Sequence, residues 1–109
     1  MIREREGTLL RMFIGDADRH EGRPLYRVIV ERARAAGLAG ATVLHGPMGF
    51  GRHARVHTAK LADVEGHLPV VIEIVDGEAA IDGFMAEVDS LLGKGLVTLE
   101  KVRIVSFET

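Results

Sequence analysis

The largely apolar segment Thr8–Gly15 predicts a β-strand, in which the period of two places Leu10, Met12 and Ile14 on one face and Leu9, Arg11 and Phe13 on the other. After a polar connection, Pro24 opens a predicted helix, because proline suits the first turn, and a glycine thirteen positions later ends it. The apolar positions of this helix repeat at helical spacing and are expected to be buried. They are Leu25, Val28, Ile29, Ala33 and Ala36.

The second half of the pattern predicts three more strands and one more helix. Ala41–Leu44 is a short strand, and a third strand begins near His57–Lys60 and resumes as Leu68–Val75. Apolar residues fill both faces of the resumed segment, which predicts a central strand. Asp76 is expected to cap the second helix, and Val97–Phe107 forms the last strand. The buried stripe of the second helix is predicted to be Ile81, Phe84, Met85, Val88 and Leu92.

This order of strand, helix, strand, strand, helix, strand predicts the α+β ferredoxin-like βαββαβ fold in a single domain over residues 1–109. Both helices are expected to cover one face of a four-stranded antiparallel sheet. The other face is then left open, and exposed apolar surface costs about 25 cal/mol per Å², so self-association is expected. The residues predicted to face that side are Phe13, Val71, Val75, Leu99 and Val105.

The amino-acid composition and the distribution of charge exclude several kinds of binding site. The 109 residues carry a net charge of −2, which gives no indication of nucleic-acid binding. Charge is divided, because residues 1–60 hold 11 basic and 6 acidic side chains (+5) and residues 61–109 hold 3 and 10 (−7). The absence of cysteine excludes disulfides, thiolate zinc sites and a cysteine nucleophile. No apolar run reaches the roughly 18 residues of a membrane span, and we expect a cytoplasmic protein.

The densest candidate chemistry lies between Gly46 and His57, where three glycines, two arginines and two histidines gather. Glycine permits close backbone approach to a ligand, and arginine suits a phosphate. Arg52 and Arg55 are the candidate cations of this mobile loop. It lacks the Gly-Lys-Ser/Thr ending of a Walker loop and the third glycine of the dinucleotide fingerprint. The alternative is a long hairpin whose glycines only form turns.

Three smaller constellations remain. Gly93-Lys94-Gly95 either ends a helix or presents a lysine to phosphate. Histidines would be the ligands of a metal site, although the chain has no cysteine that could serve as a further ligand. Glu73 and Glu100 fall within predicted strands, with neighbouring cations as their expected partners. No nucleophile–base pair is apparent, so an enzyme is not expected. The candidate metal ligands are His45, His53 and His57, and the expected partners of the glutamates are Lys101 or Arg103.

Several segments, in the right order, resemble the PII-like proteins grouped as domain of unknown function 190. They cover nearly the whole chain. PII signalling proteins are also similar, since they carry a Gly-x-Thr-Val strand followed by Gly-Phe-Gly-Arg, seen here as Gly40–Val43 and Gly49–Arg52. The matching segments are Gly22–Tyr26, Gly40–Gly51, His57–Lys60, Leu68–Asp76 and Gly95–Val102.

The resemblance implies a homotrimeric regulatory protein that binds a small anion, such as the adenine nucleotides ATP, ADP or AMP, in clefts between subunits. It also implies that the loop over residues 46–57 docks onto a membrane transporter, a channel or an enzyme. A CutA-like protein that binds divalent metals is the alternative of similar fold. The residues onto which ligand binding is carried over are Thr42, Gly49, Phe50, Gly51, Arg52, His53, Lys94 and Gly95.

Overall fold

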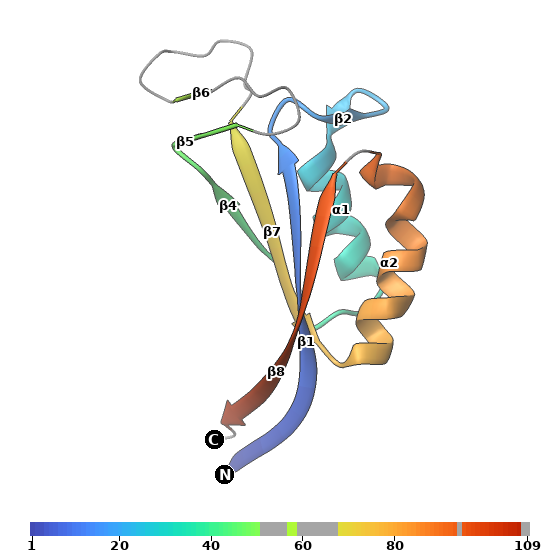
Figure 1. The fold of residues 1–109 in the computed structure, drawn as a ribbon. Helices are drawn as coiled ribbons and strands as arrows, with labels where there is room; N and C mark the ends of the chain where they lie inside the picture. The colour runs from blue at the N-terminus through green and yellow to red at the C-terminus, as the bar shows by residue number, and fades with distance from the viewer. Residues whose placement is uncertain (51–56, 59–67, 94, 108–109) are drawn as a thin grey trace.

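A computed structural model of the protein describes residues 1–50, 57–58, 68–93 and 95–107. It has two layers, with helices α1 (Leu25–Ala35) and α2 (Glu78–Leu92) on one face of a four-stranded antiparallel sheet (Figure 1). The strand order is β4-β7-β1-β8, which confirms the predicted ferredoxin-like α+β fold. The strands are β1 (Ile2–Gly15), β4 (Thr42–His45), β7 (Pro69–Asp76) and β8 (Leu96–Phe107).

Four further strands, each of two residues, lie at one end of this sheet. They form two separate ladders, β2 with β3 and β5 with β6. The prediction of a third main strand beginning near His57–Lys60 was wrong, because His57 and Thr58 pair with Gly49 and Met48 rather than with the main sheet. The third strand of the main sheet begins only at Pro69. The small strands are β2 (Arg19–His20), β3 (Arg23–Pro24), β5 (Met48–Gly49) and β6 (His57–Thr58).

Both helices end as their sequences predict. Gly37 has φ +81°, and Leu38 N–H donates to the carbonyl of Ala33 at 3.1 Å, which closes α1 in the left-handed conformation that glycine tolerates. Gly93 terminates α2 with φ +55°. The predicted cap of α2 was wrong by one residue, because Gly77 occupies the N-cap position and Asp76 is the last residue of β7.

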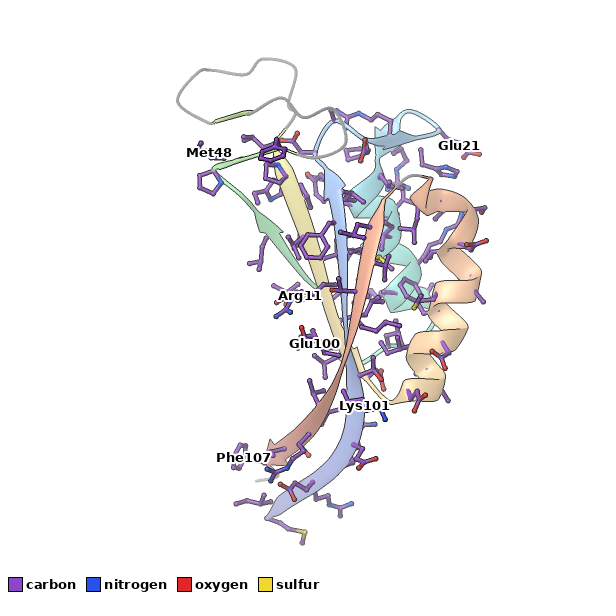
Figure 2. The ribbon with its side chains drawn as sticks, in the orientation of Figure 1. Arg11, Glu21, Met48, Glu100, Lys101 and Phe107 are labelled. Carbon is purple, nitrogen blue, oxygen red and sulfur yellow. The ribbon has the colours of Figure 1, made fainter. Side chains whose placement is uncertain are left out.

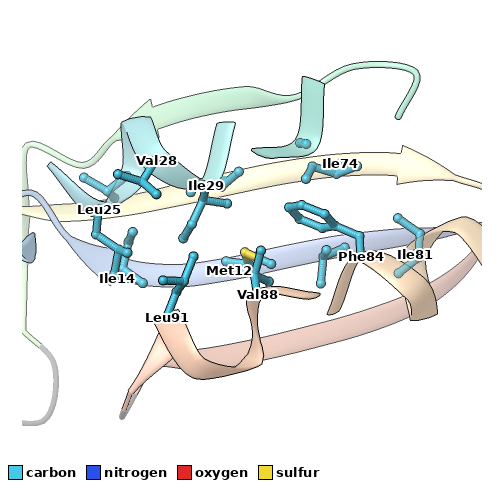
Figure 3. Close-up of a cluster of buried hydrophobic side chains, with 14 residues drawn as sticks. Met12, Ile14, Leu25, Val28, Ile29, Ile74, Ile81, Phe84, Val88 and Leu91 are labelled. Carbon is cyan, nitrogen blue, oxygen red and sulfur yellow. The ribbon is translucent and has the colours of Figure 1, made fainter. Parts of the chain in front are cut away.

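The core lies between the sheet and the two helices (Figure 3). Alternate residues of β1 and β7 point into it, as the period of two requires. In α2 the buried position near the C-terminal end is Leu91, whereas the predicted Leu92 is half-buried. The predicted Ala36 is exposed because it caps the end of α1. The buried residues are Leu10, Met12, Ile14, Leu25, Val28, Ile29, Ala33, Val70, Ile72, Ile74, Ile81, Phe84, Val88 and Leu91.

The sheet face opposite the helices carries apolar side chains, as predicted, but β8 contributes different ones. Continuous pairing places Leu99 opposite Leu10 and Val105 opposite Glu4, so both share the face on which the helices lie. The prediction for these two residues was therefore wrong by one position along β8. We call the residues on the other side the open face: Leu9, Arg11, Phe13, Thr42, Leu44, Val71, Glu73, Val75, Leu96, Thr98 and Glu100.

Asp76 joins three segments where β7 meets α2. Its carboxylate accepts hydrogen bonds from the backbone N–H groups of Ala39 at 2.9 Å and Gly77 at 2.7 Å, and Arg5 lies 3.7 Å away. The bond from Ala39 is the largest of the influences that lower the pKa of Asp76 from its ordinary value. A depressed pKa in the folded state stabilises the fold above the unfolded-state value, near 4, and the contribution is lost as the pH falls through the folded value.

The first prediction concerns this acid sensitivity. The urea midpoint of the natural protein should fall more steeply between pH 5 and pH 3 than that of Asp76→Asn, which has no carboxylate to protonate at this position. Asp82→Asn, an exposed change on α2, is the matched control and should follow the natural protein. Parallel curves for the natural protein and Asp76→Asn would show that Asp76 does not set the pH dependence.

Candidate functional site

The loop that carries the candidate ligand residues begins against Pro69. The backbone N–H of Gly46 donates to the Pro69 carbonyl at 2.8 Å. A Cβ added at Gly46 would lie 2.7 Å from Pro69 Cγ, and one added at Gly49 would lie 2.9 Å from the same atom. These two glycines therefore allow the chain to pass over the proline ring. Gly49 was predicted to give a ligand close access to the backbone, and the described contact gives both Gly46 and Gly49 a packing role.

The second prediction tests this anchor. Gly46→Ala should lower the free energy of unfolding by about 1–3 kcal/mol, the usual cost of forcing an extra methyl group into a packed site. Gly40→Ala is the matched control, because nothing lies within 4 Å of a Cβ added there. In a Pro69→Ala background the proline Cγ is gone, so the cost of Gly46→Ala should largely vanish. An equal cost in both backgrounds would contradict the contact.

Gly95 lies at the same end of the sheet but at its opposite edge. Its N–H donates to the Leu92 carbonyl at 2.8 Å, and an added Cβ would lie 3.6 Å from the Phe13 carbonyl oxygen. Strands β7 and β1 separate β4, which leads into the loop, from β8, which follows Gly95. Three strand spacings correspond to about 14 Å. One protomer therefore keeps the two predicted halves of the site apart.

The remaining predicted ligand residues have different surroundings. Thr42 is exposed on the open face, where it pairs across the sheet with Glu73. Phe50 is largely exposed directly after β5. The other four predicted ligand residues lie outside the described residues. They are Gly51, Arg52, His53 and Lys94.

The histidines do not assemble into a metal site within the described part of the chain. His45 lies at the end of β4 and packs edge-on against Tyr26 of α1, with ring centroids 5.2 Å apart. His57 falls in β6, and His53 is outside the described residues. No group of three or more potential ligands is found among the residues that the structure describes.

A charged cluster that the sequence did not indicate lies at the centre of the open face. Arg11 Nε donates to Glu73 at 2.8 Å, and Arg11 Nη1 donates to Glu100 at 2.9 Å. The bond to Glu73 is the main reason why the pKa of Arg11 lies above its ordinary value. The expected partners Lys101 and Arg103 were wrong. Lys101 lies on the other face of β8 (Figure 2), and Arg103 pairs with Glu4.

The charged cluster of Arg11, Glu73 and Glu100 has a net charge of −1 and is surrounded by apolar residues of the open face. The row beside them crosses all four strands and consists of Leu44, Val71, Phe13 and Leu96. An apolar row of this kind, with a charged cluster at its border, is typical of a surface that contacts another protein.

Among the described residues, neither helix is long and apolar enough to cross a membrane.

PII-like and CutA proteins of known structure share this ferredoxin-like fold. CPII, a nitrogen regulatory PII-like protein from Thiomonas intermedia whose structure holds ADP, AMP and bicarbonate, superposes with a TM-score of 0.70 at 14% identity over 94% of this chain and 91% of that chain. CutA from Synechococcus elongatus, complexed with Bis-Tris, gives a TM-score of 0.62 at 13% identity over 98% of this chain and 90% of that one.

Sequence similarity identifies the family within that class. Residues 7–104 match the model of DUF190, described as an uncharacterized ACR, so the chain belongs to this family. A UPF0166 protein of Aquifex aeolicus is 40% identical over 99 residues, which cover 89% of this chain and 91% of the relative. The predicted membership of a PII-like family is therefore confirmed.

Proposed function

We propose that this protein is a PII-like regulator that binds an adenine nucleotide between subunits of a homotrimer. The observation that carries the proposal is its fold, which it shares with a PII-like protein whose structure holds ADP and AMP. The chain's own sequence adds a glycine-rich, arginine-bearing loop at one end of the sheet. Backbone amides and guanidinium groups in such a loop suit phosphate oxygens.

The separation of the two halves of the site supports a ligand position between copies. The loop residues follow β4 at one edge of the sheet, and Lys94 and Gly95 precede β8 at the other edge. A nucleotide phosphate chain does not bridge about 14 Å across the sheet of one protomer. The two halves act on one ligand if the β4 edge of one copy lies beside the β8 edge of the next.

In this arrangement each residue has a distinct role. Gly49 and Gly51 give the backbone close access to phosphate, Arg52 and Lys94 neutralise its charge, and Thr42 supplies a hydroxyl. Phe50, His53 and Gly95 complete the contacts around the ligand. The ligand would order the loop over residues 46–57 and so change the surface that a membrane transporter, a channel or an enzyme meets. We assign no catalytic role to the chain.

Calorimetry with ATP, ADP and AMP, each with and without magnesium, tests the proposal, with bicarbonate as a further ligand. At least one adenine nucleotide should bind, and Arg52→Ala should weaken it tenfold or more because a charged hydrogen bond to phosphate is lost. Arg34→Ala removes the same charge from the end of α1 remote from the loop and should leave the affinity unchanged. Failure of all three nucleotides to bind would overturn the proposal.

A metal-binding role is the second candidate, because a CutA structure superposes over nearly the whole chain. His53 and His57 are four residues apart in the sequence near the end of the same loop and would supply imidazole ligands, together with His45, which precedes the loop. Zinc and copper titrations of the protein and of a His53→Ala, His57→Ala double variant distinguish the two candidates. Equal metal affinity in both proteins would exclude this second function.

A further inference from the structure

The two helices form the outer layer of the protomer and carry opposite charges. We call the solvent-facing sides of α1 and α2 the helix layer. Helix α1 holds three basic residues and one acidic residue, which gives +2, and α2 holds four acidic residues and no basic one, which gives −4. The charged residues are Arg27, Glu31, Arg32 and Arg34 in α1 and Glu78, Asp82, Glu87 and Asp89 in α2.

Four of these charges are exposed and unpaired within the described part of the chain. They are Arg27 and Arg34 of α1 and Asp82 and Asp89 of α2. Glu31, by contrast, accepts a hydrogen bond from Arg23 at 2.6 Å. Opposite charges that neighbouring helices leave unpaired are available to a second molecule, which they orient by charge complementarity.

Two of the four charges are unfavourable for their own helix. Arg27 lies in the first turn of α1, where the helix dipole favours acidic residues, and that turn holds none. Asp89 begins the last turn of α2, where the dipole favours basic residues, and that turn also holds none. The stability of the separate helices therefore gives no reason for either charge, whereas a partner that pairs both of them does.

The solvent-facing side of α2 also leaves room for another helix. Ala79, Gly83, Ala86 and Ser90 are exposed and recur at helical spacing. A Cβ added at Gly83 would have nothing within 4 Å. Small side chains along the middle of a helix surface form a groove that the larger side chains of a second helix can enter. Long arginine side chains are suited to cross this groove toward the acidic residues beside it.

We propose that the helix layer pairs with the helix layer of a second copy of this chain, so that α1 of each copy lies on α2 of the other. The two helices run antiparallel, and α1 begins where α2 ends (Figure 1). A two-fold axis parallel to the helices and between them sets Arg27 of each copy opposite Asp89 of the other. Arg34 then meets Asp82, because both pairs are seven residues, or about 10.5 Å, apart on their helices.

A second copy fits this layer better than an unrelated partner. An acidic partner would suit α1 alone and would be repelled by α2, whereas a second helix layer offers both charges in the required order. Helices of 11 and 15 residues are about 16 and 22 Å long and pack about 10 Å apart. A contact of this size is at the low end for specific interfaces, so the pairing is weak and reversible. It involves neither the open face nor the nucleotide.

Charge reversal tests the pairing. Arg27→Asp protein and Asp89→Arg protein are followed by sedimentation velocity at low ionic strength and high micromolar concentration, each alone and then as an equimolar mixture. Each variant alone sets like charges opposite each other at both ends of the contact, and its dissociation constant should rise at least tenfold. In the mixture a chain of one kind meets a chain of the other with opposite charges at both ends, so association should return.

The double variant Arg27→Asp, Asp89→Arg is the matched control, because it carries both substitutions and restores both pairs between identical chains. It should associate as the natural protein does. At about 1 M salt, where the Debye length is about 3 Å, this association should disappear, whereas any association through the apolar open face should remain. Unchanged association of both single variants, or failure of the mixture and the double variant to recover it, would overturn the proposal.

Discussion

Phe13→Glu is expected to abolish the proposed self-association and to leave free protomers of 11.9 kDa. Phe13 lies on the open face of β1, one of the two central strands of the sheet. Its direct neighbours on the adjacent strands are Val71 of β7 and Leu96 of β8, and Phe13 is 38% exposed in the protomer. Association would bury the new carboxylate on a surface whose charge is already −1, because Arg11, the cation that the described residues place on this face, is already paired with Glu73 and Glu100. Burying an unpaired charge costs several kcal/mol, enough to raise the dissociation constant a hundredfold or more.

Sedimentation velocity over a range of micromolar concentrations measures this effect. Met48→Glu is the matched control, because Met48 is an exposed apolar residue that lies outside the open face. The Phe13→Glu protomer should keep its far-ultraviolet circular dichroism, since the substituted side chain points away from the core. An assembly of unchanged mass in Phe13→Glu would show that the open face is not the surface through which copies associate.

Phe84→Ala is expected to cost about 3–5 kcal/mol of folding free energy, as truncation of a buried phenylalanine usually does. Phe84 projects from α2 into the core between the two layers (Figure 3) and is only 2% exposed. Its removal leaves a cavity lined by residues from the sheet, which a rigid sheet cannot fill. Phe50→Ala removes the same side chain from an exposed position and should change the stability by less than about 0.5 kcal/mol.

Urea unfolding of the Phe13→Glu protein gives the cleanest background for this comparison, because association then does not add to the measured stability. The slope of the free energy against urea concentration should stay constant while the midpoint falls. A loss below about 1 kcal/mol for Phe84→Ala would mean that the helix layer is not packed on the sheet as described.

Much of the fold follows from local pattern, and the errors have physical causes. Leu10, Met12 and Ile14 alternate with polar or outward residues, so their burial was predictable. The first six residues of β1 were missed because Arg3–Glu6 carry charges and pair only with β8, where no core imposes an apolar face. Strand β8 was placed one residue out of phase because it is an edge strand with apolar residues on both faces.

The candidate site was predictable only in part. Glycine and arginine content identified the loop, but the role of Pro69 beneath Gly46 and Gly49 depends on contacts between distant segments. The charged cluster joins Arg11 to residues 62 and 89 positions away, and only strand register brings them together. Sequence alone likewise does not show that the loop and Gly95 lie at opposite edges of one sheet. That separation is what makes a site between copies the favoured arrangement.

A crystal structure of the protein grown with ADP tests the central claim most directly. The proposal predicts a nucleotide between two copies, with its phosphates contacted by the Gly49–Arg52 segment of one copy and by Lys94 or Gly95 of the next. It also predicts that the open faces are covered by neighbouring copies of the same assembly. A nucleotide contacted by one copy alone, or bound on the helix layer, would contradict the account.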